Sequence, residues 1–186
     1  MAYNIKDIFY LDTNVTITAA TAGSGSAQLD LSAYIDPIAR GRQKGTGLAV
    51  YKVQYSMTDD SASSPSKVDE DGTARVAMLA GAGLGDNATG AFTTGADALR
   101  ADNSLAVDLQ DWYGAASVPS GNSGMFTTLV QPSEDVPYVI VRDNVCLVYT
   151  MGTNIKNTSF LSVRLSCAQI TLDQATLNQL LRTQTV

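Results

Sequence analysis

Polar and apolar residues alternate along most of this chain with a period of two. In the stretch "NVTITA", Val15 and Ile17 fall on one face and Thr16 falls on the other. Other stretches with the same alternation lie at residues 27–33, 51–55, 74–80, 105–109 and 161–167. Alternation of this kind is typical of β-strands that bury one face. The pattern therefore predicts about eight or nine short strands.

The alternation also assigns individual side chains to faces, because residues two apart in a regular strand share a face. It places Tyr51 together with Val53, and Val107 together with Leu109, on the apolar side of their strands.

The stretch "PYVIVRDNVCLVYTMG" has the strongest local turn signal. Two β-rich runs flank Asp143 and Asn144, and both of these residues tolerate the left-handed backbone of a two-residue hairpin turn. The sequence predicts an antiparallel hairpin that pairs residues 138–142 with 145–150.

One helix is expected, at the C-terminus, in "TLDQATLNQLLRTQ". Thr171 and Gln174 match the spacing of a capping box. An apolar stripe then recurs at helical spacing and can dock on a neighbouring surface. Its members are Ala175, Leu177, Leu180 and Leu181.

Many short strands that do not alternate with helices indicate an all-β sandwich or barrel. We therefore expect residues 1–186 to form a single antiparallel β-sandwich or jelly roll with one short C-terminal helix. No internal repeat or linker divides the chain.

The charge content narrows the function. Only 16 % of the 186 residues are charged, against roughly 25 % in typical soluble domains. Interface cores are depleted in charge, so this composition fits a protein covered by neighbours; it also fits a secreted β protein. The net charge of −6 argues against general nucleic-acid binding, which relies on the release of counterions from phosphates.

The chain contains no histidine, so it lacks the commonest general base and metal ligand. A glycine-rich stretch, "LAGAGLGDNATG", resembles a dinucleotide-binding loop, but Asp86 stands where that fingerprint needs its third glycine. We expect no enzyme activity, cofactor, metal or small-molecule substrate.

Cys146 and Cys167 both lie within apolar, strand-like runs. Two buried free thiols are the favoured interpretation, and a disulfide between neighbouring strands is the alternative.

Two groups of residues are candidate contact sites. The first is an interface with other subunits, made by a basic loop and by the helix stripe: Arg40, Arg42, Lys44, Leu177, Leu180 and Leu181. The second is a ligand site in "VDLQDWYG". Acidic and aromatic side chains, of the kind that bind sugars, lie together in this stretch: Asp108, Asp111, Trp112 and Tyr113. The favoured interpretation of the second group is a strand end that closes the core with an aromatic anchor.

Short strands, long Gly/Ala/Thr-rich loops, low charge and the lack of catalytic residues together resemble the small single-jelly-roll capsid proteins of internal-membrane icosahedral viruses of archaea and bacteria. The resemblance implies a virion protein, assembled in the host cytoplasm, that binds copies of itself and also a second capsid protein or an inner membrane. Residues 1–39 hold one basic residue, Lys6, so direct contact with nucleic acid is not expected. No signal peptide or transmembrane segment is expected either. The alternative is a carbohydrate-binding or adhesive β-sandwich, such as a spike, fibre or filament subunit.

Overall fold

The computed structural model describes residues 7–18, 23–36, 44–59, 73–81, 99–113, 125–151 and 158–184. Nine strands and one helix lie in these ranges: β1 (Ile8–Ile17), β2 (Gly23–Asp30), β3 (Lys44–Asp59), β4 (Thr73–Ala80), β5 (Ala106–Tyr113), β6 (Met125–Val130), β7 (Tyr138–Ile140), β8 (Asn144–Met151), β9 (Ser159–Asp173) and α1 (Gln174–Thr183).

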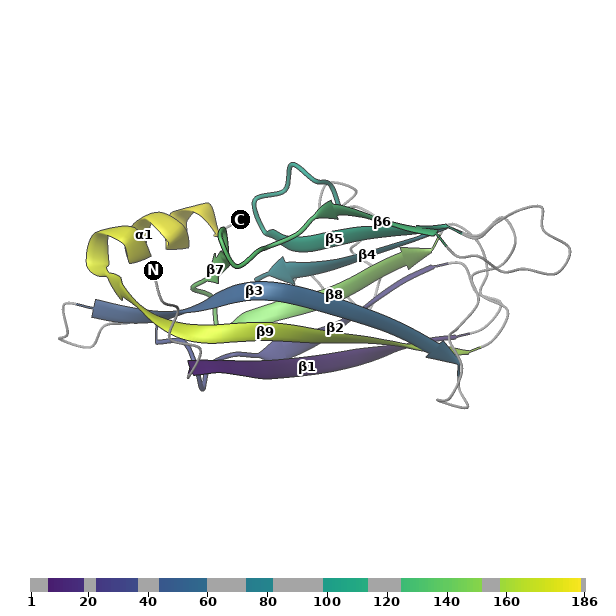
Figure 1. The fold of residues 1–186 in the computed structure, drawn as a ribbon, viewed down its shortest axis with the longest axis horizontal. Coiled ribbons are helices and arrows are strands. Elements are labelled where there is room, and N and C mark those ends of the chain that lie inside the picture. The colour runs from purple at the N-terminus through teal and green to yellow at the C-terminus, as the bar shows by residue number, and fades with distance from the viewer. Residues whose placement is uncertain are drawn as a thin grey trace, which may run out of the picture.

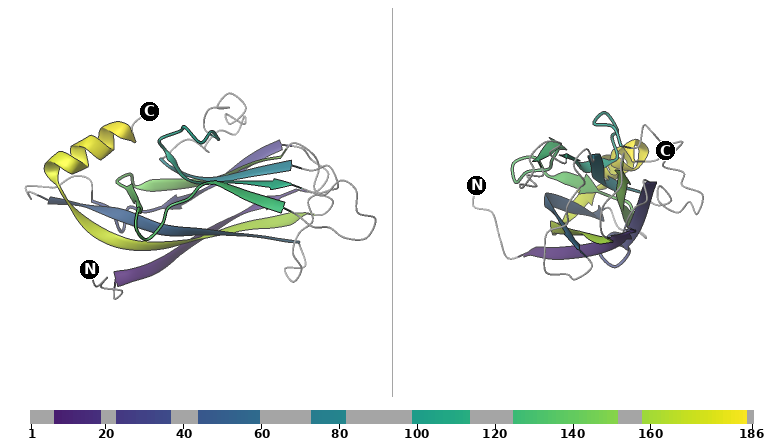
Figure 2. Two further views of the ribbon diagram at one scale, coloured as in Figure 1. Left: turned by 45° about the horizontal axis from the view of Figure 1, so that its top comes forward. Right: turned by 90° about the vertical axis from the view of Figure 1, so that its right-hand side faces the viewer.

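The strands form two antiparallel sheets that pack face to face (Figures 1 and 2). The four-stranded sheet has the order β1-β9-β3-β7, and the five-stranded sheet has the order β2-β8-β4-β5-β6. The strands pair in a nested order along the sequence, from the ends of the chain towards its middle. β1 pairs with β9, β2 with β8, β3 with β7 and β4 with β5. This nesting is the strand order of a jelly roll, with β6 added at one edge. The predicted fold class is confirmed.

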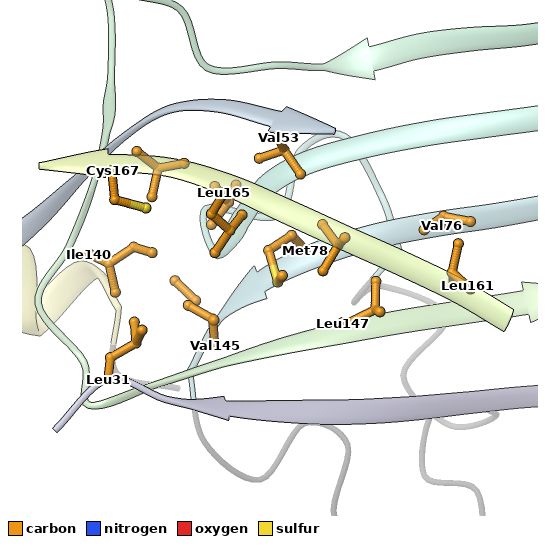
Figure 3. Close-up of a cluster of buried hydrophobic side chains, with 14 of the residues drawn as sticks. Leu31, Val53, Val76, Met78, Ile140, Val145, Leu147, Leu161, Leu165 and Cys167 are labelled. Atoms are coloured by element: carbon orange, nitrogen blue, oxygen red, sulfur yellow. The ribbon is translucent and has the colours of Figure 1, made fainter. Parts of the chain in front are cut away.

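The hydrophobic core fills the space between the sheets. Figure 3 shows apolar side chains from both sheets meeting there. In β9 the inward-facing row is fully or almost fully buried, as the alternation predicts: Leu161, Val163, Leu165 and Cys167.

A second, smaller cluster covers the outer face of the five-stranded sheet. Leu99 packs there against outward-facing residues of β4, β5 and β8, among them Leu79, Leu109 and Val148. Strands β4 and β8 are therefore buried on both faces, which explains why they read as nearly continuous apolar runs.

Both cysteines are buried free thiols, which was the favoured interpretation. Cys146 belongs to the outer cluster, while Cys167 lies in the core between the sheets. Burial raises the pKa of Cys146 to about 11 and that of Cys167 to about 12. Both thiols therefore stay protonated at neutral pH.

Register shifts in β3 and β5 interrupt the predicted alternation. In β3 the register shifts between Val50 and Lys52, and Tyr51 lies on the outer face instead of beside Val53. In β5 the register shifts after Ala106, so that Val107 faces the core while Leu109 joins the outer cluster. The predicted pairings of these side chains were wrong, because an extra residue in a strand reverses the faces that follow it.

The predicted hairpin is also wrong. β7 pairs with β3 in one sheet, whereas β8 lies between β2 and β4 in the other. The segment that contains Asp143 crosses between the sheets, and the carbonyl of Asp143 accepts from the Leu31 N–H at 2.6 Å. β8 is a central strand, because it forms backbone hydrogen bonds with β2 on one edge and with β4 on the other. Neither edge is left for a hairpin partner.

The helix begins two residues later than the capping box suggested. Strand β9 runs on through Thr171 to Asp173, and the Asp173 carboxylate accepts from the Thr176 N–H at 2.8 Å as the N-cap. Leu177 is fully buried against the start of β3. A Cβ atom at Gly45 would lie 2.6 Å from Leu177 Cδ2, so the helix docks closely because that position is glycine.

Gln184, the C-cap of α1, links the helix to β7. Its side-chain amide accepts from the Val141 N–H at 3.1 Å and donates to the Val139 carbonyl at 2.6 Å. Gln184 is 4 % exposed. The Gln184 side chain thus pairs with the backbone at the edge of β7 in the way that a neighbouring strand would.

Replacing Gln184 with alanine is expected to lower the free energy of unfolding by about 1–3 kcal/mol, because buried backbone groups of β7 lose their partners. Urea denaturation measures this loss. The control is Gln179→Ala on the exposed side of the same helix, expected to change stability by less than about 0.5 kcal/mol. Equal effects of the two variants would contradict the role of Gln184.

Candidate functional site

Asp108 is a carboxyl group sealed inside the sandwich. The bulge in β5 aligns it with Met78, whose side chain belongs to the core, and Asp108 is 0 % exposed. The Tyr55 hydroxyl approaches it from the opposite sheet and the Gln110 side chain approaches from the same strand. Neither is placed to complete a hydrogen bond, so three oxygen atoms, both of Asp108 and the hydroxyl of Tyr55, are buried without a partner.

Burial is the main cause of the altered protonation of Asp108. Burial raises the pKa of this carboxyl to about 7, and the nearby Tyr55 hydroxyl and Gln110 side chain lower the pKa by less than burial raises it. The pKa of Tyr55 is raised as well, mainly by burial and then by the negative charge of Asp108. A carboxyl with no exposed surface is not reached by a substrate or a sugar, so Asp108 does not serve the ligand site that the sequence suggested.

Asp111 faces the other way, on the outer side of the five-stranded sheet. It forms a two-pronged ion pair with Arg75 of β4, with Nε–Oδ1 at 2.5 Å and Nη2–Oδ2 at 2.7 Å. Arg75 also donates from Nη1 to the Leu99 carbonyl at 3.0 Å. The ion pair joins neighbouring strands, and the hydrogen bond to Leu99 holds the start of the 99–105 segment on the sheet. Arg75 and Asp111 therefore have a structural role.

Trp112 is half-buried and packs against the core between the sheets. Its indole N–H lies 3.4 Å from Gln110 Oε1. Tyr113 ends β5, and its side chain lies outside the described residues. The structure does not bring the described members of the proposed ligand site to one face. Asp108 and Trp112 face inward and Asp111 faces outward, which fits the core-closing explanation.

The proposed interface residues are only partly placed. Arg40 and Arg42 lie outside the described residues. Lys44 is exposed at the start of β3, opposite Asp173 in the register. Because Leu177 is buried within the chain itself, the helix face left for a neighbour holds the half-buried Leu180 and Leu181.

A third surface, which the sequence analysis did not single out, lies on the outer face of the four-stranded sheet. Two hollows of about 470 and 380 Å³ share Gln54 as a common wall. We call them together the outer trough. They are lined from β1, β3, β9 and the segment after β6, chiefly by Tyr10, Asp12, Asn14, Tyr51, Lys52, Gln54, Glu134, Ser162, Arg164 and Ser166.

The described part of the chain holds no group of three acidic or cysteine side chains arranged to bind a metal ion. Within the same ranges, no helix has the length and apolar character that crossing a bilayer requires.

Comparison with known proteins finds neither a matching family model nor a matching curated protein. The solved structures that match include several polyomavirus proteins called VP1. The human polyomavirus 7 VP1 pentamer has a TM-score of 0.47 and 11 % identity, over 93 % of this chain and 98 % of that one. The human polyomavirus 6 VP1 pentamer has a TM-score of 0.45 and 12 % identity, over the same shares.

VP1 of the trichodysplasia spinulosa-associated polyomavirus, solved with GM1 oligosaccharide, has a TM-score of 0.44 and 9 % identity, over 93 % of this chain and 97 % of that one. At scores this low the jelly-roll assignment rests on the strand order described above, and not on these likenesses.

Proposed function

We propose that this chain, as one jelly-roll domain over residues 1–186, is a structural subunit of a viral shell that assembles with copies of itself. The observation that carries the proposal is the strand order, with β1-β9-β3-β7 facing β2-β8-β4-β5. Jelly rolls of this kind occur in viral capsid proteins, lectins and cupins.

The chemistry of the chain favours the first of these classes. Histidine is the commonest transition-metal ligand, and the chain has none, which argues against the metal chemistry of cupins. Asp108, whose pKa burial raises to about 7, is enclosed in the core. A charge content of 16 % fits a surface that neighbouring subunits cover.

The proposal extends to the kind of shell. A net charge of −6 gives no general attraction to a nucleic-acid genome. A shell around an inner membrane, as in the internal-membrane viruses of archaea and bacteria, fits this charge better than a shell in direct contact with the genome. A second capsid protein and assembly in the host cytoplasm belong to the same proposal.

One end of the sandwich is the proposed contact surface between subunits. Helix α1 lies at this end (Figure 1) and docks on the start of β3, where Lys44 is exposed. Leu180 and Leu181 are half-buried there. Apolar side chains beside an exposed basic residue fit an interface core with a polar rim.

We expect the purified protein to form defined oligomers or particles. Light scattering coupled to size-exclusion chromatography measures the mass, and negative-stain electron microscopy shows any particles. The double variant Leu180→Asp/Leu181→Asp is expected to weaken association by about tenfold or more, because it places charge in an apolar contact.

The matched control is Gln179→Asp, at an exposed position of the same helix outside the apolar stripe, with folding of each variant checked by circular dichroism. A wild-type protein that stays monomeric at every concentration would contradict the shell-forming role. Unchanged assembly of a folded double variant would contradict the choice of surface.

A further inference from the structure

The outer trough has a simple cause in the sequence of three neighbouring strands. On the outer face of β9, small and long side chains follow one another as Ser162, Arg164 and Ser166. Ser166 lies between Tyr10 of β1 and Lys52 of β3 in the sheet register. A short side chain between two longer ones leaves a hollow. Farther along β9, Ser162 lies between Asn14 and Ser56, so small side chains form the floor of the second hollow.

Tyr10 presents an aromatic ring at the wall of the trough. It is 63 % exposed, which is high for a large side chain with an apolar ring. The Arg164 guanidinium carbon lies 5.9 Å from the centre of this ring, within the range of a cation–π contact. The contact favours one ring orientation, so part of the ordering cost of binding is met before a ligand arrives.

The charges that line the trough are balanced. Lys52 and Arg164 are basic, while Asp12 and Glu134 are acidic. A balanced lining gives no net attraction to a polyanion such as nucleic acid. Ile8 is the exposed aliphatic side chain of this lining, and Pro132 and Val163 are buried. The exposed apolar surface is too small for an acyl chain, and charged groups at this density are unlike the core of a protein interface.

The remaining ligand class is neutral, polar and hydroxyl-rich. Gln54 offers amide donors and acceptors where the two hollows meet, and Ser162 and Ser166 offer hydroxyl groups on the floor. Tyr10 offers an apolar ring face with a polar tip. Hollows of about 470 and 380 Å³ lie within the usual size range of small-ligand sites.

We propose that the outer trough binds a neutral oligosaccharide. One sugar ring lies on the Tyr10 ring, and the chain of sugars continues past Gln54 into the second hollow. Amide, carboxylate and hydroxyl groups of the lining bond the sugar hydroxyls. This site is separate from the surface at α1, so the proposal does not depend on the shell-forming role.

The test is isothermal titration calorimetry of the full chain with cellotriose, maltotriose, tri-N-acetylchitotriose and N-acetyllactosamine, beside a heparin tetrasaccharide. We expect at least one neutral sugar to bind. Tyr10→Ala and Gln54→Ala should each weaken binding by about tenfold, the usual scale for truncating a central contact. Tyr10→Phe keeps the ring and should retain most of the affinity.

The control is Val136→Ala, an apolar position that is 73 % exposed and does not line the trough. The proposal fails if none of the neutral sugars binds, or if Tyr10→Ala and Val136→Ala bind alike. Salt-sensitive binding of the heparin fragment alone would indicate a polyanion site instead. A change in oligomer mass in Tyr10→Ala, without sugar binding to the wild type, would assign this face to a second copy of the chain.

Discussion

Asp108→Asn is expected to stabilise the protein at pH 8 by up to about 4 kcal/mol and to change little at pH 4. The carboxyl has a pKa of about 7 in the folded state, against an ordinary value of 3.8. Between these values the folded state holds a proton that the unfolded state has lost. The contribution of Asp108 to stability is therefore fully present below about pH 4 and is lost as the pH rises to 7.

Urea denaturation of wild type and variant from pH 4 to pH 9 gives this contribution as the difference between the two stability curves. Taking the difference removes the opposite slopes of exposed carboxylates such as Asp30, whose pKa a hydrogen bond from Ser32 lowers. Asp135→Asn, at an exposed position, is the control for the substitution itself. If the stability difference between wild type and Asp108→Asn does not change with pH, burial does not disfavour the ionised form of Asp108 and the prediction is wrong.

Breaking the ion pair between Arg75 and Asp111 is expected to change stability in the opposite direction and to destabilise the protein. Arg75→Ala leaves the carboxylate of Asp111, which is 8 % exposed, without the cation that pairs with it. Breaking a buried ion pair from one side costs about 3–5 kcal/mol. Because Arg75 is 36 % exposed along its side chain, we expect a value near the lower end, about 3 kcal/mol. Asp111→Asn should destabilise the protein too, in contrast to Asp108→Asn.

The matched control for this ion pair is Arg100→Ala. Arg100 pairs with Asp102 at 2.8 Å, but both side chains are more than half exposed, so solvent screens the attraction and the loss should be below about 1 kcal/mol. Thermal or urea denaturation at pH 7 ranks the variants. Similar losses for Arg75→Ala and Arg100→Ala would contradict the structural role given to the Arg75–Asp111 pair.

The two carboxyl groups also show where sequence reasoning succeeds and where it stops. Alternation predicts the buried rows of β1 and β9 because both strands are regular against their partners. It fails at Tyr51 and Leu109 because a bulge depends on the register with a neighbouring strand. That register is set by contacts between residues far apart in the chain. The isolation of Asp108 from solvent follows from the same irregularity and has no local signal.

The hairpin around Asp143 fails for a related reason. A turn-forming pair between two β-rich runs fits a hairpin, and it fits equally well a crossing from one sheet to the other. The choice is made by partners elsewhere, since β3 and Gln184 hold β7 while β2 and β4 hold β8. The outer trough was missed because polar positions of three separate strands become neighbours only when β9 lies between β1 and β3.

The place of β9 in the four-stranded sheet has a consequence for biosynthesis. β1 is the first strand to leave the ribosome, yet its partner in the sheet, β9, is the last strand to be translated. β3 likewise waits for β9 along most of its length. Pairing over such sequence distances is slow, so the newly made chain exposes unpaired strand edges until β9 has been synthesised. Early chaperone contact with the nascent chain should therefore centre on Ile8–Ile17 and on Lys44–Asp59.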